Sequence, residues 1–143
     1  MEAKELMIGD WLFYRGQFNA FEFKVVHITK QTVGYHAEPD ESRIRYLRLS
    51  ECEAVPITSE ILERNGFGKY NLYNIKEQHQ WVLWFDKLTR VSLWYRELND
   101  DNRDGMMVRV ESPLANLCIK VCYLHQLQHA LKLCGIEKEI TIY

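Results

Sequence analysis

The sequence predicts an α+β fold: a small N-terminal SH3-like β-barrel, a short linking helix, then an antiparallel sheet packed with one C-terminal helix. Two observations lead to this prediction. Apolar and polar residues alternate in short segments along most of the chain, which is typical of strands in antiparallel sheets. Two other segments place apolar residues three and four positions apart and end near a glycine, which is typical of helices. At 143 residues, the chain has the length of one domain or of two small lobes that share a core.

The first lobe, residues 1–57, is expected to contain only short strands. Gly9 and Asp10 form a turn signal before the first aromatic strand, and a polar run at residues 39–42 separates two later strands. Five short strands within about fifty residues are too few for a sandwich and suit a small barrel. The predicted strands are residues 11–14, 21–29, 32–38, 44–49 and 54–57.

The second lobe, residues 58–143, is expected to begin with the linking helix. Thr58 is a good N-cap, Glu60 lies in the first turn, and Asn65-Gly66 ends the helix. Residues 87–89 are expected to close a hairpin between two of the strands that follow. These strands are predicted at residues 70–75, 80–86, 90–97, 106–111 and 116–121, with a last edge strand at residues 139–143.

The clearest helix covers residues 123–136. Leu124, Leu127 and Leu131 recur at the spacing of one helical face and should be buried, whereas His125 and His129 should be at least partly exposed on the other side. Gly135 stands where a left-handed closing residue belongs, and the next residue can fold back on Leu131.

The composition excludes several broad classes of protein. Hydrophobic residues make up 47% and charged residues 27% of the chain, and the formal net charge of −2 does not indicate a protein that binds polyanions by bulk charge. The N-terminal residues do not form a secretory signal, and no apolar run approaches the length of a membrane span. The four cysteines lack paired C-x-x-C spacing, so we expect reduced thiols and a cytoplasmic location.

Three stretches together resemble a known family. They are L-M-I-G-D-W-L at residues 6–12, P-I-T-S-E-I-L-E-R-N-G-F at residues 56–67, and Y-L-H-Q-L-Q-H-A-L-K-L-C-G-I-E-K-E-I at residues 123–140. The set resembles a family of small uncharacterised proteins of Bacteroides-type bacteria, often encoded in prophage or other mobile elements. The resemblance implies a bacterial cytoplasmic protein with an accessory role, and it implies no particular activity.

The histidines and cysteines of the C-terminal helix do not predict a metal site. His125 and His129 have the spacing of a zinc-binding pair, but Gln126 stands where the general base of the H-E-x-x-H motif belongs. Cys118 and Cys122 are too close to the histidines for the hairpin-to-helix connection of a zinc finger. Without a recognisable nucleophile, phosphate-binding loop or dinucleotide fingerprint, we expect no catalytic residues, no metal and no cofactor.

The aromatic residues of the second lobe are the better indication of function. In the predicted hairpin, Trp84 and Trp94 share one face with Arg96, and surfaces rich in aromatic residues and arginine are common where proteins bind partners. The alternative is that this face packs on the N-terminal barrel, since a two-layer domain must cover its apolar surfaces. The sequence therefore favours a non-enzymatic interaction or adaptor protein that binds another protein or a second copy of itself.

A second hypothesis is a single-stranded nucleic-acid-binding accessory factor. Small barrels often bind oligonucleotides, and one predicted barrel strand carries basic residues around a tyrosine. The near-neutral net charge argues against strong binding, because phosphate neutralisation supplies most non-specific affinity. The residues of this alternative face are Arg43, Arg45, Tyr46 and Arg48.

Overall fold

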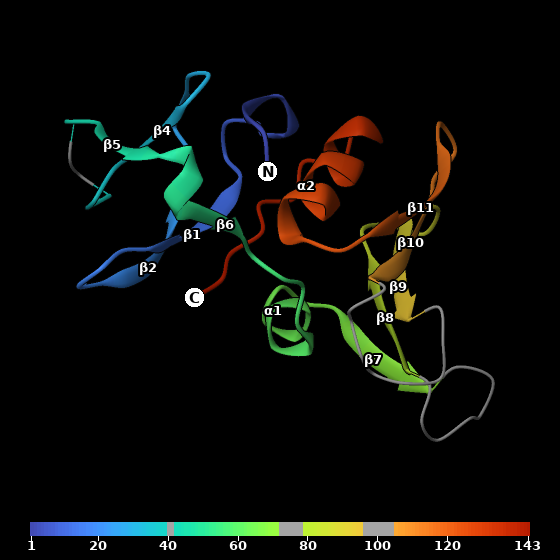
Figure 1. The fold of residues 1–143 in the computed structure, drawn as a ribbon. Coiled ribbons are helices and arrows are strands. Elements are labelled where there is room, and N and C mark those ends of the chain that lie inside the picture. Colours follow the sequence, from blue (N-terminus) through green and yellow to red (C-terminus); the bar gives the residue numbers. More distant parts are fainter. Residues whose placement is uncertain (40–41, 72–78, 96–104) are drawn as a thin grey trace. The chain divides into compact units, whose positions relative to one another are not determined.

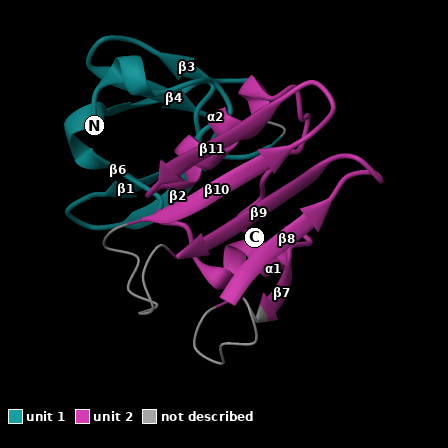
Figure 2. Ribbon diagram, turned by 90° about the vertical axis from the view of Figure 1, so that its right-hand side faces the viewer, with its two compact units in different colours: residues 1–55 teal, residues 56–143 magenta. Residues whose placement is uncertain are grey.

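The two kinds of sequence pattern produce sheets and helices in two compact units. The structure is a computed structural model that describes residues 1–39, 42–71, 79–95 and 105–143 (Figure 1). Unit 1 spans Met1–Val55 and unit 2 spans Pro56–Tyr143, and the predicted lobes met two residues later, after residue 57 (Figure 2). No helix in the described part of the chain has the length and apolar character needed to cross a membrane.

Unit 1 contains two three-stranded antiparallel sheets. The strand orders are β2-β1-β6 and β3-β4-β5. The elements are the 3-10 helices η1 (Ala3–Glu5) and η2 (Leu49–Glu51) and the strands β1 (Trp11–Arg15), β2 (Ala20–Lys24), β3 (His27–Ile28), β4 (Thr32–Tyr35), β5 (Arg45–Arg48) and β6 (Cys52–Ala54). Both sheets contribute to one buried cluster, which includes Leu12 from β1, Phe23 from β2 and Val33 from β4. The α+β class with antiparallel sheets is confirmed, but the described strands of unit 1 do not pair into a closed barrel.

The predicted strand at residues 21–29 is divided between the two sheets. Val25 donates its backbone N–H to Asp10 (N···O 2.8 Å), and the next residue, Val26, donates to Gly34 of β4 (2.8 Å). The chain thus changes partners between two adjacent residues, which is how a bent strand forms the corner between two sheets. The apolar residues stand at odd positions up to Val25 and at even positions from Val26, so the apolar pair Val25-Val26 marks the corner in the sequence.

Unit 2 contains a five-stranded antiparallel sheet and two α-helices. The strand order is β11-β10-β9-β8-β7, and each neighbouring pair is antiparallel. The elements are α1 (Ser59–Arg64), β7 (Gly68–Asn71), β8 (His79–Trp84), β9 (Arg90–Tyr95), β10 (Met106–Glu111), β11 (Asn116–Val121) and α2 (Leu124–Leu133). Both helices lie on the same side of this sheet (Figures 1 and 2). The sheet therefore has one face toward its helices and one face away from them.

Helix α2 lies within the predicted range 123–136 and closes at Gly135 as predicted, but its buried side is wider. Leu127 and Leu131 are buried, and Gly135 adopts a positive φ of 74° while Ile136 donates its N–H to the Leu131 carbonyl (2.9 Å). The prediction that His125 is exposed is wrong, because only 5% of this residue is accessible. Its ring is stacked against that of Tyr123, with ring centroids 6.0 Å apart, so the exposed tyrosine helps to cover the histidine. His129 is partly exposed, as predicted.

The C-terminal residues are held by the end of α1 rather than by strand pairing. The side-chain nitrogen of Asn65 donates to the carbonyls of Ile61 and Thr141 (2.7 Å each), and its side-chain oxygen accepts from the Thr141 N–H (2.9 Å). The amide thus gives Thr141 the donor and acceptor that a neighbouring strand would provide. Ile140 and Ile142, on either side of Thr141, are buried. The predicted edge strand at residues 139–143 is therefore wrong, and one asparagine side chain replaces the sheet edge.

Replacing Asn65 should loosen this attachment. Asn65 is only 5% exposed, so Asn65→Ala removes a buried partner from both the carbonyl and the N–H of Thr141, and leaves the Ile61 carbonyl only its backbone donor. We expect the free energy of unfolding, measured by urea denaturation, to fall by about 2 to 4 kcal/mol. The control Asn116→Ala, an exposed position on β11, should stay within about 0.5 kcal/mol of the parent. Equal effects of the two substitutions would contradict the role given to Asn65.

Candidate functional site

Successive side chains of β8, β9 and β10 alternate between the two faces of the unit 2 sheet. Trp81, Leu93 and Val108 are direct neighbours across the three strands, and all three are buried. Their neighbours in sequence point to the opposite face, because successive side chains of a strand alternate. Trp84 lies on that opposite face and is 56% exposed. The face directed away from α1 and α2, which Figure 2 views from the front, is therefore open at Trp84.

The strand register arranges the side chains of the open face in rows. One row runs through Gln80, Trp94 and Met107, the next through Val82, Ser92 and Arg109, and the last through Trp84, Arg90 and Glu111. Directly opposed side chains in antiparallel strands have Cβ atoms about 5 Å apart, and diagonal neighbours remain within reach of long side chains. Each arginine therefore lies close to a tryptophan.

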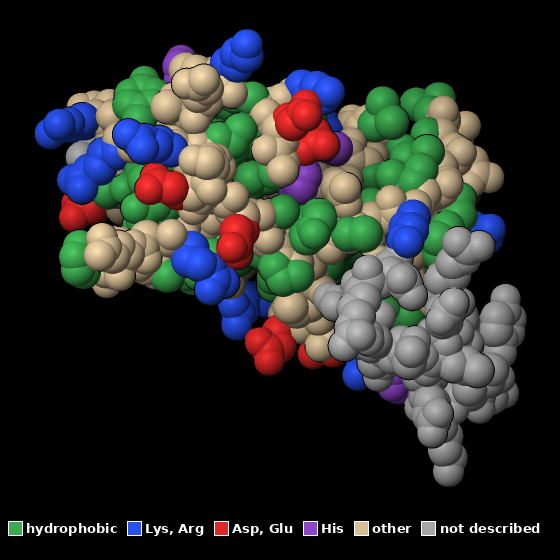
Figure 3. Space-filling model, in the orientation of Figure 1, with side chains coloured by type: hydrophobic (Ala, Val, Ile, Leu, Met, Phe, Trp, Pro, Cys, Tyr) green, Lys and Arg blue, Asp and Glu red, His purple; other side chains and the backbone are tan. Residues whose placement is uncertain are grey.

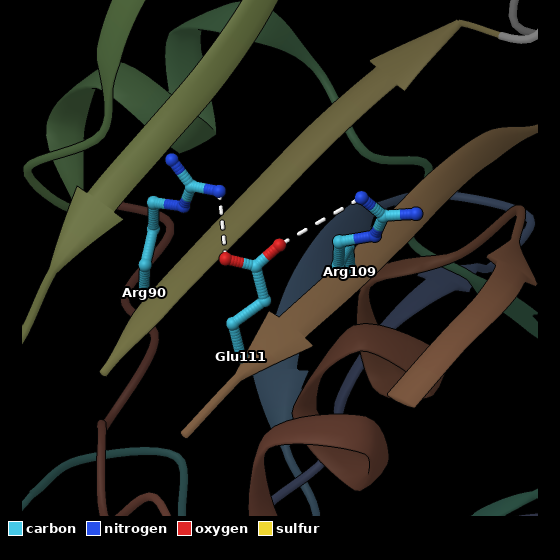
Figure 4. A network of polar contacts seen from close by, with 3 residues as sticks. All are labelled: Arg90, Arg109 and Glu111. Atoms are coloured by element: carbon cyan, nitrogen blue, oxygen red, sulfur yellow. Dashed lines mark hydrogen bonds and ion pairs between the residues drawn. The ribbon is translucent and has the colours of Figure 1, made fainter. Parts of the chain in front are cut away.

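A carboxylate connects the two arginines of this face. The Arg90 Nη2 donates to the Glu111 Oε2 at 2.7 Å, and the Arg109 Nη1 lies 3.7 Å from the Glu111 Oε1 (Figure 4). The Arg90 and Glu111 side chains are both 35% exposed, and that of Arg109 is 50% exposed. Ion pairs this accessible contribute about 1 kcal/mol or less to stability. Their main effect is to order the guanidinium groups.

Each arginine also contacts a tryptophan ring. The Arg90 guanidinium carbon lies 5.2 Å from the ring centroid of Trp84, and that of Arg109 lies 5.9 Å from the ring centroid of Trp94. Both distances are within the range of cation–π attraction. The contacts form one continuous chain from Trp84 to Trp94 through the two arginines and their shared carboxylate. We call these five residues, Trp84, Arg90, Trp94, Arg109 and Glu111, the aromatic–arginine surface.

Exposed side chains of the two edge strands extend this surface. Tyr70 of β7 is opposite Gln80, in the row of Trp94, and is 55% exposed. Its ring lies over Gly68, where an added Cβ would be about 3.0 Å from the nearest ring carbon of Tyr70. Lys120 of β11 is opposite Met107 and exposed. The open face thus combines aromatic, thioether and cationic side chains.

The structure brings together part of the predicted site. Trp84 and Trp94 lie on the same face, as the alternation predicts, whereas Arg96 is outside the described residues. Sequence reasoning missed Arg90, although it lies at the same parity as Trp94 on β9. It also missed Arg109 and Glu111, because their position depends on the β9–β10 register, which cannot be read from either strand alone.

The basic residues predicted to share one face in unit 1 lie on both sides of strand β5. Arg43 precedes β5, and within β5 Arg45 is opposite Tyr35 whereas Tyr46 is opposite Gly34. Tyr46 and Arg48 therefore share one face, and Arg45 points to the other. The four residues do not form the single basic face that was predicted. Lys and Arg side chains do gather over the β4–β5 part of unit 1, with acidic side chains among them (Figure 3).

Two aromatic rings, those of Tyr46 and His27, contact each other on the Tyr46 side of β5. The Tyr46 ring is 53% exposed and contacts the His27 ring edge-to-face, with ring centroids 5.6 Å apart. Gly34 lies between them, and a Cβ there would be 2.9 Å from the Cβ of His27 and 3.2 Å from the Tyr46 ring. Glycine at position 34 therefore leaves the space that the His27 and Tyr46 side chains occupy over β4.

The two histidines of α2 contact each other, and the glutamine near them caps the helix. His125 and His129 contact each other with ring centroids 5.6 Å apart. Between them in sequence, Gln126 accepts hydrogen bonds at its Oε1 from the N–H groups of Cys122 (2.7 Å) and Tyr123 (3.1 Å). Gln126 thus satisfies donors at the start of α2, as capping residues do. The described residues contain no group of three or more His, Cys, Asp or Glu side chains placed to hold a metal ion.

Comparisons of the chain with protein-family models, curated proteins and solved structures found no match.

The cysteines differ in how easily they form a thiolate. Burial, and then the negative charge of Glu51, raise the pKa of the Cys52 thiol to about 11, and its Sγ donates to the Arg48 carbonyl (3.4 Å). Burial also raises the pKa of Cys134. Cys118 is exposed on the open face of the sheet. Because the thiolate is the reactive form, Cys52 is a poor nucleophile at neutral pH.

This difference is measurable by alkylation. At pH 8, well below a pKa of about 11, Cys52 remains protonated as well as buried. We expect iodoacetamide to modify Cys118 at least about a hundredfold faster than Cys52 in the folded protein. Peptide mass spectrometry measures the rate at each cysteine. In denaturant the two rates should become similar. Rapid labelling of Cys52 in the folded state would contradict its protected position.

Proposed function

We propose that the chain is a non-enzymatic protein-binding or adaptor protein that binds its partner through the aromatic–arginine surface. The observation behind this proposal is the contact chain in which Trp84 and Trp94 are each paired with an ordered arginine on an open sheet face. Tryptophan, tyrosine and arginine are the residues that contribute most often to binding energy at protein interfaces. Because these side chains are already ordered before binding, less conformational entropy is lost when a partner docks.

The groups on this surface are suited to binding rather than to bond-breaking chemistry. Glu111, its carboxylate, is already shared between Arg90 and Arg109. The remaining members are aromatic rings and guanidinium groups, which recognise partners by stacking and by directed hydrogen bonds. A rigid sheet keeps them in fixed positions, which favours specific recognition.

The second candidate is binding of single-stranded nucleic acid. The exposed Tyr46 ring and Arg48, on one side of β5, favour it, since an aromatic ring beside a cation can stack a base and contact a phosphate. The division of the basic residues between two faces weakens it, because phosphate contacts supply most of the affinity of such proteins.

The proposal also includes the fold type of unit 1 and the cellular role of the protein. The corner at Val25 and Val26, where the chain passes between two three-stranded sheets, supports an SH3-like arrangement in unit 1. The sequence resemblance to proteins of prophage and mobile elements supports an accessory role in the bacterial cytoplasm.

Selection of random peptides tests the proposed function directly, because the selection itself supplies the binding partners. A displayed library of random short peptides is selected on the immobilised full chain, and the selected peptides are titrated against Trp84→Ala and Trp94→Ala. Phe18→Ala is the matched control, because Phe18 is an exposed aromatic residue on unit 1, outside the surface. We expect each tryptophan substitution to weaken binding at least about fivefold, as for interface residues that contribute strongly.

Thermal melts of each variant establish that it is folded before binding is compared. If the selected peptides bind the tryptophan variants as tightly as the parent chain, the aromatic–arginine surface is not the binding site.

A further inference from the structure

The open sheet face differs in charge from the rest of the chain. Its described charged side chains are Arg90, Arg109 and Lys120 against Glu111, three cations and one carboxylate, which gives a formal charge of +2. The whole chain has a formal net charge of −2. Positive charge is therefore concentrated on the face that carries the exposed tryptophan, against the overall sign of the protein.

Glu111 shows how this face holds a carboxylate. It accepts a hydrogen bond from Arg90 and forms a longer ion pair with Arg109. Each guanidinium carries five N–H donors in a planar fork that matches a carboxylate. One carboxylate therefore uses only a part of their capacity, and the half-exposed Arg109 is the more accessible of the two.

We propose that the partner of this surface is an acidic peptide segment, whose carboxylates bind Arg109, next to Glu111, and Lys120, in the row of Trp94, and whose apolar side chains pack on Trp84 and Trp94. This inference rests on the proposed protein-binding function and adds the chemistry of the partner. Complementary charge across an interface both speeds association and rejects partners of the wrong sign.

The same charges argue against a second copy of the chain as the partner. Two copies that meet through this face would bring like charges together, which costs several kcal/mol across an interface.

The geometry favours a peptide over a nucleic-acid strand. Arg90 and Arg109 each lie over a tryptophan ring, so one face of each ring is already covered by a cation. A strand of stacked bases needs open ring faces and many phosphate contacts. Glu111 places a negative charge in the middle of the surface, where it would repel a phosphate backbone but leaves room for separate carboxylates.

Charge variants of the full chain test the inference with the peptides selected above. A synthetic peptide whose binding depends on Trp84 and Trp94 is titrated against each variant in ~50 mM and ~200 mM salt. Two other probes are titrated in the same way: a copy of the peptide in which Asp and Glu are replaced by Asn and Gln, and oligothymidylate. We expect Arg109→Gln and Lys120→Gln each to weaken binding about threefold to tenfold, and Glu111→Gln to strengthen it about threefold. Lys132→Gln, which removes an exposed cation on α2, is the matched control and should change nothing.

The outcomes separate this inference from the proposed function. Peptides that depend on both tryptophans, are enriched in Asp and Glu, and lose affinity with salt and in the amide copy support the inference. Peptides that depend on the tryptophans but are neutral or basic overturn the acidic partner and leave the binding surface intact. Oligothymidylate that binds more tightly than the peptides and depends on the same tryptophans identifies a nucleic-acid surface and overturns both.

Discussion

The register between β9 and β10 is the constraint on which the described surface depends. It places Arg90 beside Glu111 and brings Arg109 diagonal to Trp94, so that ion pairs and ring contacts join into one chain. A shift of one residue would turn Val108 and Val110 out of the buried face, since neighbouring side chains point to opposite sides of a strand. The burial of these valines thus selects the register, and the register in turn assembles the surface. Hydrophobic burial on one face positions the polar contacts on the other.

The helical side of the sheet uses side-chain amides where regular pairing ends. Gln126 closes the start of α2, and Asn65 joins the end of α1 to Thr141 near the C-terminus. The Asn65 amide is buried and both of its ends are hydrogen-bonded, so a displacement would leave polar groups without these partners in a region of low dielectric. These contacts hold the start of α2 and the end of α1 in defined positions, on the side of the sheet opposite the aromatic–arginine surface.

Local patterns predicted much of the fold, and the differences have identifiable physical causes. The observed bounds of β10 and β11 equal the predicted ranges, because Met106, Val108 and Val110 alternate strictly with residues of the open face. Residues 21–29 are predicted as one strand because apolar residues alternate on both sides of the corner, and only the pair Val25-Val26 marks the change of phase. Residues 139–143 resemble a strand because alternating burial does not require a strand partner. For the site, alternation within one hairpin was enough to place Trp84 and Trp94 on one face. Arg109 and Glu111 could not be assigned in this way, since β10 is joined to β9 by a long connection and no short turn defines their register.

The central claim, that the sheet is open at Trp84 on one face and buried at Trp81 on the other, can be tested directly by NMR with a soluble paramagnetic cosolute. The cosolute broadens the resonances of nuclei that solvent can approach. The account predicts strong broadening of the Trp84 ring protons and little change for Trp81, which lies on the buried face of the same strand and is 2% exposed. Equal protection of the two rings would mean that the face of Trp84 is covered, and would contradict the account.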